Sequence, residues 1–347
     1  MLRRLYLITA SLLIVLCGCG GGGTRGGTLT GPPPTSLGKI YVSNAAGNSI
    51  VRFDNALTVT GNTGPGATIS GASTQLSAPQ YMLLDTTNNR LFVANQGASS
   101  VVVFENASTK TGNVTPERTI SGGATLLVSP VDVALDSGRN LLYVADGSNI
   151  LAFSGASTIN GNSPPVRTIG VGFIVSAIFF DPANDRLFAA DTTGNTVRVY
   201  DGASLLNGAV AANRIISGAA TQLNKPAGLQ VDTAGRLIVS NFGTPSITIY
   251  SSAATTSGNV TPVATIAGSN TGLGAPTQMI LNNATTTGDL HVADGKSAAV
   301  LVFTNIGSAN GNITPARNIS GANTGLARSA GGTGPFTATG IALDTTR

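Results

Sequence analysis

A dipeptide that returns at nearly constant spacing is the feature that most constrains how this chain can fold. Gly-Asn occurs five times in one series and Gly208-Ala209 fills a sixth position, with intervals between 47 and 53 residues; the Gly-Asn copies begin at Gly61, Gly112, Gly161, Gly258 and Gly311. An Arg-x-Ile-Ser-Gly-like stretch follows most copies, as at Arg118 to Gly122. A repeat of this length is typical of architectures that use one supersecondary unit many times.

Each repeat unit contains four short runs of β-type residues. In the second unit these runs are residues 81–84, 90–94, 101–104 and 118–120, and Gly, Asn, Asp and Ser turns separate them. This pattern is typical of antiparallel hairpins, and no segment shows a sustained helical period. Four strands in a unit of roughly 50 residues match one blade of a β-propeller. The sequence therefore predicts an all-β propeller with four antiparallel strands per blade.

The number of blades follows from two residues that recur once in each unit, which we call markers. An Asn or Asp ends each second strand, and another ends each first strand; the second-strand set is Asn44, Asn95, Asp146, Asp191, Asn241 and Asp294, and the first-strand set is Asp85, Asp136, Asp181, Asp232, Asn282 and Asp344. The two sets are out of phase, because the repeats start at a second strand (residues 39–43) and stop after a first strand (residues 338–343). We therefore predict six blades, with the C-terminal strand completing the first blade and closing the ring.

The strand–turn–strand core of the units resembles the NHL-repeat propellers. That core reads Leu187-Phe-Ala-Ala-Asp191, Gly194-Asn195 and Val197-Arg-Val-Tyr200, and residues 40–53 match it as well. The resemblance extends over nearly all of residues 37–347. It implies the same fold that the repeat arithmetic predicts.

The N-terminus has the pattern of a processing signal rather than of a folded element. Arg3 and Arg4 precede an apolar run from Leu5 to Leu16, which is too short for a membrane span of roughly 20 residues but typical of a signal peptide. The run ends in Leu16-Cys17-Gly18-Cys19, which resembles the bacterial lipobox. That resemblance implies a signal peptide over residues 1–18 and a diacylated Cys19. Residues 19–37 then form a Gly/Thr/Pro-rich tether, and residues 38–347 form the propeller.

The same residues predict a location in the cell envelope. Gly20 follows Cys19 in place of the Asp that resembles an inner-membrane retention signal. We therefore expect an outer-membrane lipoprotein, periplasmic or surface-exposed, if the cell is Gram-negative. Cys17 and Cys19 are the only cysteines, so the mature body is expected to hold neither a disulfide nor a cysteine-ligated metal. The formal net charge is +4, of which Arg3 and Arg4 supply two; without a polybasic cluster, nucleic acid is not expected as a partner.

Several repeated polar residues have structural explanations. We expect the six second-strand Asn and Asp residues to accept hydrogen bonds in the turn that follows each of them. The basic residues before the second strands are expected to pair with the nearby first-strand Asp residues; they are Lys39, Arg90, Arg139, Arg186 and Arg236. The arginines of the outermost strands are expected to discourage edge-to-edge pairing; they are Arg118, Arg167, Arg214 and Arg317.

Catalytic candidates are few. The single histidine, His291, occupies a position held by Tyr, Phe or Ile in the other units, and a packing role is expected. A resemblance to NHL-type amidating lyases would imply a His-dependent site, which one histidine cannot supply. A resemblance to gluconolactonase-like propellers would imply a metal held by acidic and amide groups, but the only glutamates, Glu105 and Glu117, lie on outer parts of a blade. No cofactor and no metal site is therefore predicted.

One position on the innermost strands remains as a candidate site. Four residues before each first-strand marker, the chain carries Tyr81, Asp132, Ala177, Gly228, Gln278 and Gly340. We predict that Tyr81, Asp132 and Gln278 line a small-ligand pocket on the axis. A lone carboxylate provides neither a metal site nor an acid/base pair.

These observations leave three functions open. The favoured hypothesis is a non-catalytic binding or scaffold module, held at a membrane by Cys19, that engages a protein or glycan through one face. The second is a lactonase- or lyase-like enzyme with a site at the mouth of the channel. The third is a purely structural envelope protein.

Overall fold

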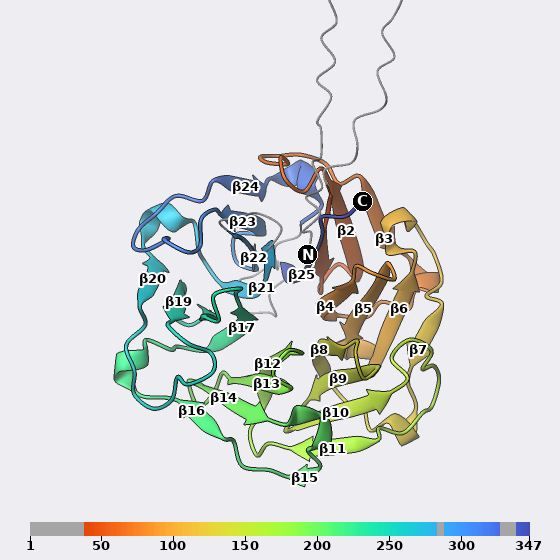
Figure 1. The fold of residues 1–347 in the computed structure, drawn as a ribbon. Helices are drawn as coiled ribbons and strands as arrows, with labels where there is room; N and C mark the ends of the chain where they lie inside the picture. Colours follow the sequence, from red (N-terminus) through yellow and green to blue (C-terminus); the bar gives the residue numbers. More distant parts are fainter. Residues whose placement is uncertain (1–37, 283–287, 327–337) are drawn as a thin grey trace, which may run out of the picture. The chain divides into compact units, whose positions relative to one another are not determined.

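The structure is a computed structural model that describes residues 38–282, 288–326 and 338–347. The predicted signal peptide and tether, with Cys19, lie outside these residues. The described residues belong to one compact unit. Six antiparallel sheets surround a common axis as the blades of a propeller (Figure 1), which confirms the predicted fold and blade number. No helix in the described part of the chain is long and apolar enough to span a bilayer.

Every blade has four antiparallel strands, ordered from the axis outward. Blade 1 consists of β25 (Ala338–Asp344), β1 (Lys39–Asn44), β2 (Ser49–Asp54) and β3 (Ala67–Ser70). Blade 2 consists of β4 (Pro79–Asp85), β5 (Arg90–Asn95), β6 (Ser100–Glu105) and β7 (Arg118–Ile120). Blade 3 consists of β8 (Pro130–Asp136), β9 (Leu141–Asp146), β10 (Asn149–Ser154) and β11 (Arg167–Gly170). Blade 4 consists of β12 (Val175–Asp181), β13 (Arg186–Asp191), β14 (Thr196–Asp201) and β16 (Arg214–Ile216). Blade 5 consists of β17 (Pro226–Val231), β18 (Leu237–Asn241), β19 (Ser246–Tyr250) and β20 (Ala264–Ala267). Blade 6 consists of β21 (Pro276–Asn282), β22 (Asp289–Asp294), β23 (Ala299–Phe303) and β24 (Arg317–Ser320).

Short elements that the sequence did not predict join and border the blades. Blade 3 carries a fifth, two-residue strand, β15 (Gly208–Ala209), which pairs in parallel with β11. The 3₁₀ helices are η1 (Ala72–Thr74), η2 (Gln96–Ala98), η3 (Ala107–Thr109), η4 (Gly123–Thr125), η5 (Ala203–Leu205), η6 (Ala219–Thr221), η7 (Ser269–Thr271) and η8 (Ala322–Thr324).

The C-terminal strand closes the ring. β25 pairs antiparallel with β1, so that Ile341 lies opposite Val42 and Leu343 opposite Ile40. The end of the chain thus supplies the innermost strand of the blade that the start of the repeats builds, as predicted. Because β25 also contacts β4 and β21, the inner strands form an unbroken ring in the centre of Figure 1.

A second closure runs around the outside of the ring. The outer-strand isoleucine of each blade forms a parallel bridge with the glycine of the next blade's Gly-Asn position; the pairs include Ile69 with Gly112, Ile216 with Gly258, and Ile319 with Gly61. The last of these pairs joins blade 6 to blade 1. The repeated dipeptide is therefore an inter-blade contact, which explains its constant spacing.

The asparagine of the dipeptide completes this contact. The Asn113 Oδ1 atom accepts a 2.7 Å hydrogen bond from the Ser73 N–H in η1, and Asn62, Asn162, Asn259 and Asn312 do the same for η8, η4, η6 and η7. A Cβ atom at Gly71 would lie 2.5 Å from the Asn113 Oδ1 atom, and Gly71 has a φ of 116°, so this position requires glycine. Where Ala209 replaces asparagine, no 3₁₀ helix separates β11 from β12.

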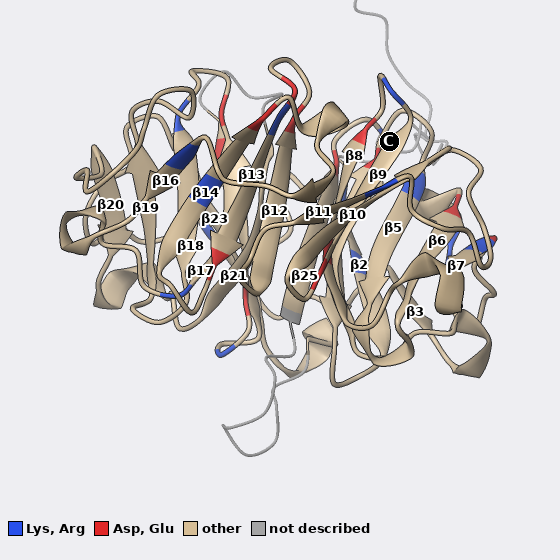
Figure 2. Cartoon of the chain, turned by 90° about the horizontal axis from the view of Figure 1, so that it is seen from below, with Lys and Arg blue, Asp and Glu red and all other residues tan. Residues whose placement is uncertain are grey.

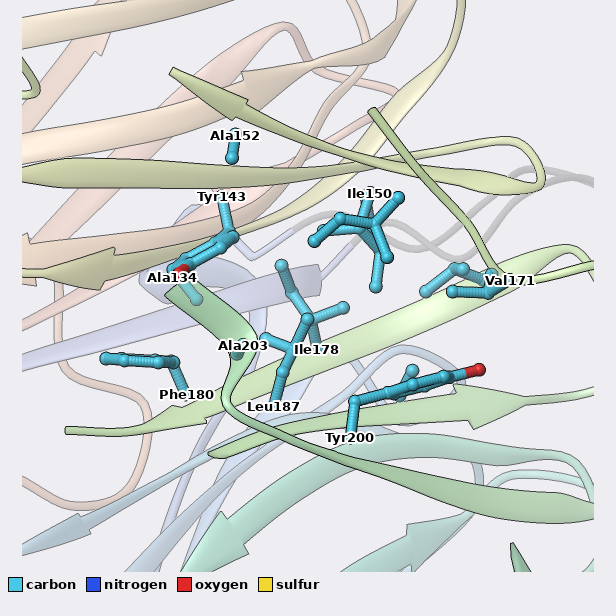
Figure 3. Close-up of a cluster of buried hydrophobic side chains, with 14 of the residues drawn as sticks. Ala134, Tyr143, Ile150, Ala152, Val171, Ile178, Phe180, Leu187, Tyr200 and Ala203 are labelled. Atoms are coloured by element: carbon cyan, nitrogen blue, oxygen red, sulfur yellow. The ribbon is translucent and has the colours of Figure 1, made fainter. Parts of the chain in front are cut away.

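The hydrophobic core is divided into six clusters, each between two neighbouring blades. Figure 3 shows the cluster between blades 3 and 4, where Tyr143 and Ile150 face Leu187 and Tyr200. The Tyr143 and Phe180 rings lie 5.2 Å apart. Alternate residues of the strands bury apolar side chains on both faces of each sheet, which is why the blades stack around the axis.

Candidate functional site

Tyr81 crosses the propeller axis. Its hydroxyl donates a 2.7 Å hydrogen bond to the Ala227 carbonyl, which joins blade 2 to blade 5 on the opposite side of the ring. The tyrosine is buried, and this burial raises its pKa far above the ordinary value, with the Asp132 charge as a second cause. Tyr81 is thus a neutral hydrogen-bond donor that fills the centre of the ring.

Asp132 joins blades 3 and 4. One carboxylate oxygen accepts a 2.8 Å bond from its neighbour's N–H, at Val133, and the other accepts a 2.8 Å bond from the Ile178 N–H. The side chain is buried, and the loss of solvent raises the Asp132 pKa to about 8, against the opposing effect of the two N–H bonds.

Gln278 joins blade 6 to blades 1 and 2. Its Nε2 atom donates to the Met82 carbonyl at 2.9 Å, and its Oε1 atom accepts from the N–H groups of Met82 at 3.1 Å and Ile341 at 2.8 Å. Each of the three predicted site residues therefore makes a hydrogen bond to another blade, Tyr81 to the opposite blade and Asp132 to the neighbouring one. Together they form an axial plug, and ligand binding by these residues stays a prediction.

The second-strand Asn and Asp residues are buried, and most bond to a different segment from the one we expected. The Asn95 Oδ1 atom accepts from the Ser77 N–H at 2.6 Å, and Asp146 accepts from the N–H groups of Val128 and Ser129. These partners lie in the loop that leads into the inner strand of the same blade. Asn95 is directly opposite Pro79, the first residue of that inner strand, so its side chain lies next to the loop. The expected bond within the following turn forms at Asp191, with the Gly194 N–H, and at Asp294, with the Ser297 N–H.

The expected ion pairs between the second-strand basic residues and the first-strand Asp residues form in two blades. Arg139 lies 2.9 Å from Asp136 and Arg236 lies 2.5 Å from Asp232. The prediction is wrong for Arg90 and Arg186, which pair with Glu105 at 2.9 Å and Asp201 at 2.7 Å on their third strands. The Asp85 and Asp181 oxygens instead accept bonds from the turn residues Asn88 and Asn184.

Outer-strand arginines reach the next blade. The Arg118 Nη1 atom donates to the carbonyls of Ala156 and Ile159, and the Arg317 Nη1 atom donates to those of Ala56 and Val59. These arginines connect neighbouring blades in addition to placing charge on the outer strand. His291 is fully buried beside Arg317, and burial lowers its pKa to about 3, in agreement with a packing role.

The described residues bring no three His, Cys, Asp or Glu side chains together in a cluster that would hold a metal ion. Glu105 pairs with Arg90 and Arg118, and Glu117 pairs with Lys110. Both glutamates are therefore engaged on the outer half of blade 2.

The two ends of the ring differ in charge. At one end of the ring lie the turns that join the inner strand to the second strand and the connections that join the third strand to the outer strand. We call this end the charged face, since most Arg, Lys, Asp and Glu residues lie there. In Figure 2 it is the edge at which the chain ends. We call the opposite end, with the loops that lead into the inner strands, the neutral face. In the described chain its charges are the exposed Lys225, the half-buried Lys296 and Arg198, and the buried Asp146, Asp191 and Asp294.

Apolar side chains are exposed on two loops of the neutral face. Leu126 and Val128, in the loop that leads into blade 3, are 53% and 71% exposed, and Ile174, in the loop that leads into blade 4, is 63% exposed. We did not predict these residues from the sequence. The repeat itself would have indicated them, since the position of Leu126 holds Gln75 and Gln222 in two other units and the position of Val128 holds Ser77 and Asn224.

Comparisons with known proteins support the fold. No protein-family pattern matches the chain, and no curated protein matches it in sequence. Among solved structures, a chain of a nidogen/laminin complex is 13% identical with a TM-score of 0.58, covering 88% of this chain and 97% of that one. A protein of unknown function from Bacteroides caccae is 9% identical with a TM-score of 0.59, covering 89% and 99%. A functionally unknown protein from Desulfotomaculum acetoxidans DSM 771 is 15% identical with a TM-score of 0.50, covering 78% and 75%. The protein is a six-bladed β-propeller.

Proposed function

We propose that this propeller is a membrane-anchored, non-catalytic binding module that engages a partner in the cell envelope through its neutral face. The observation that carries the proposal is the set of exposed apolar side chains at Leu126, Val128 and Ile174. Exposed apolar side chains that lie close together are typical of interaction sites, and here Leu126 and Val128 share one loop. Because the three side chains are aliphatic, the partner is a protein rather than a glycan.

Leu126 has a backbone conformation that lowers the stability of the propeller. It has a φ of 62°, in the left-handed region, where a side chain costs about 1 kcal/mol. Gln75 and Gln222 have the same backbone conformation, but each accepts a hydrogen bond from a threonine hydroxyl of the next blade, Thr119 or Thr265. Leucine forms no such bond, so stability does not explain its presence. A contact with a partner does.

The other two hypotheses have less support. An enzyme of the lactonase or lyase type would need carboxylates or other metal ligands in one place, but the described acidic side chains are spread over six blades. A purely structural role would not require two strongly exposed aliphatic side chains in one loop. The nidogen/laminin chain, a similar propeller, was solved in a protein complex, which shows that such a fold can bind a protein.

The anchoring and the family assignment are also proposals. The Leu16–Cys19 pattern supports lipid attachment at Cys19, and at least two membrane signals are generally needed for stable anchoring, which a diacylated cysteine provides. The NHL-type core motif over residues 187–200 forms the hairpin of β13 and β14, as that resemblance implies.

Restoring the repeat at the apolar positions tests the function. Leu126→Gln and Val128→Ser replace these residues with those of other units, so the variants should fold at least as well as the original chain. In a cross-linking and pull-down experiment from envelope extract, proteins recovered with the original chain should be lost with these variants. Leu205→Gln and Val263→Ser, at exposed apolar positions on the charged face, are matched controls and should recover the same proteins. Equal recovery by all four variants would refute binding at the neutral face.

A further inference from the structure

A cavity of about 160 Å³ lies on the axis, between the axial plug and the charged face. All six inner strands contribute to its wall. Each inner strand contributes the residue two positions before its first-strand marker. Blades 2, 4 and 6 contribute the larger apolar side chains, Leu83, Phe179 and Ile280. Blades 3, 5 and 1, which lie between them, contribute the smaller or polar side chains, Ala134, Gln230 and Ala342.

The wall of this cavity is apolar because its polar side chains have partners elsewhere. The Gln230 Nε2 atom donates to the Met279 carbonyl at 3.0 Å. The Gln278 amide is bonded to both backbone groups of Met82. At the ends of the inner strands, Asp85 and Asp181 accept bonds from their own turns. A ligand in the cavity would therefore meet mainly hydrocarbon.

The cavity can be reached from solvent. Leu83, Phe179 and Ile280 are each partly exposed, whereas a residue sealed in a core would not be. On the other side, Tyr81 and Gln278 separate the cavity from the neutral face. Any ligand must therefore enter from the charged face, so this site is independent of the protein contact proposed above.

We propose that this cavity binds one neutral apolar group of about the size of a benzene ring, carried by a small molecule. Its volume is close to that of engineered cavities of roughly 150 Å³, which are lined by Leu, Ile and Phe, stay dry and bind benzene or xenon. A charged or strongly hydrogen-bonding group is excluded, because the wall offers little to compensate for its lost hydration.

Fluorobenzene is a suitable probe, and its binding can be followed by ¹⁹F NMR titration of the purified chain carrying Cys19→Ser, which removes the need for detergent. Saturable binding is expected. Ala134→Leu and Ala342→Leu add volume inside the ring, and each should weaken binding by at least about tenfold or abolish it. Ala72→Leu makes the same change at an exposed position on η1 and should bind fluorobenzene as the original chain does.

Two outcomes would overturn the proposal. One is the absence of saturable binding by the original ring. The other is unchanged binding by filled variants whose melting temperatures show that they are folded. If neither filled variant folds, Phe179→Ala provides the test, since the enlarged cavity should bind 1-fluoronaphthalene more tightly than the original one does. A Phe179→Ala protein that folds without this gain would also contradict the assignment.

Discussion

The Oδ1 atom of Asn259 accepts a 2.8 Å hydrogen bond from the N–H of Ala220, which lies 39 residues earlier at the junction of blades 4 and 5. The bond holds the first turn of η6, and the adjacent Gly258 forms the parallel bridge to Ile216. The repeated dipeptide thus fastens each blade to the one before it. This role predicts how its loss would affect the ring.

Asn259→Ala should lower the free energy of unfolding by about 1 kcal/mol, as the loss of a capping side chain does. For a domain of this size the melting temperature should fall by roughly 2–4 °C, which calorimetry can measure. Ala209→Asn is the matched control. It should give no gain in stability, because the junction of blades 3 and 4 lacks the 3₁₀ helix that the asparagine would cap. A clear stabilisation by Ala209→Asn would contradict this explanation.

Asp132 should make the propeller less stable as the pH rises from about 4 to about 8. Burial raises the pKa of this carboxyl from 3.8 to about 8 in the folded chain, so over this range the folded state binds a proton that the unfolded state has lost. The free energy of unfolding should then decrease by at most about 1.4 kcal/mol per pH unit from this group. Chemical denaturation at several pH values would measure the slope.

Asp132→Asn should flatten that slope. Asp201→Asn is the control, because the Arg214 and Arg186 side chains hold the Asp201 pKa at about 2, below the range in question. The control should lose stability by a similar amount at every pH from 5 to 8 and keep the original slope. A slope that survives in the Asp132→Asn protein would show that another group is responsible.

Removal of residues 337–347 should unfold or aggregate the propeller. Without β25, blade 1 loses its innermost strand, and the cluster between blades 1 and 6 loses Ile341 and Leu343. Circular dichroism and sedimentation would detect the change. Removal of only Thr345 to Arg347, which follow β25, should leave a folded propeller with a slightly lower melting temperature. An unchanged melting temperature after the longer deletion would exclude ring closure by β25.

Cys19→Ser should release the protein from the membrane fraction, since the acyl chains are the proposed anchor. Cys17→Ser, two residues earlier and within the predicted signal peptide, should remain in the membrane fraction. Fractionation followed by immunoblotting distinguishes the two variants. Tight membrane association of the Cys19→Ser protein would refute the lipoprotein hypothesis.

The blade count and ring closure were predictable from the sequence because they depend on local patterns. Strand and turn residues alternate within each unit, and the two sets of marker residues are offset by one strand. The predicted runs 81–84, 90–94, 101–104 and 118–120 became β4 to β7 with ends shifted by two residues or fewer.

The partners of individual side chains depended on the tertiary structure. A repeat shows that Asn113 recurs, but only the ring places it against Ser73 of another unit. In the same way, Tyr81 reaches Ala227 because blades 2 and 5 lie opposite each other, and Arg90 finds Glu105 while Asp85 bonds within its own turn.

The sequence by itself determined the periodic features: strand order, blade number and which residues face the core, since these follow from hydrophobic alternation and turn chemistry within about 50 residues. Only the tertiary structure decided which units meet at the axis and at the junctions, and hence that the axis is blocked on one side and hollow on the other. The reason is that stacking and twist of the blades bring together side chains that are far apart in sequence, and no local pattern encodes those distances.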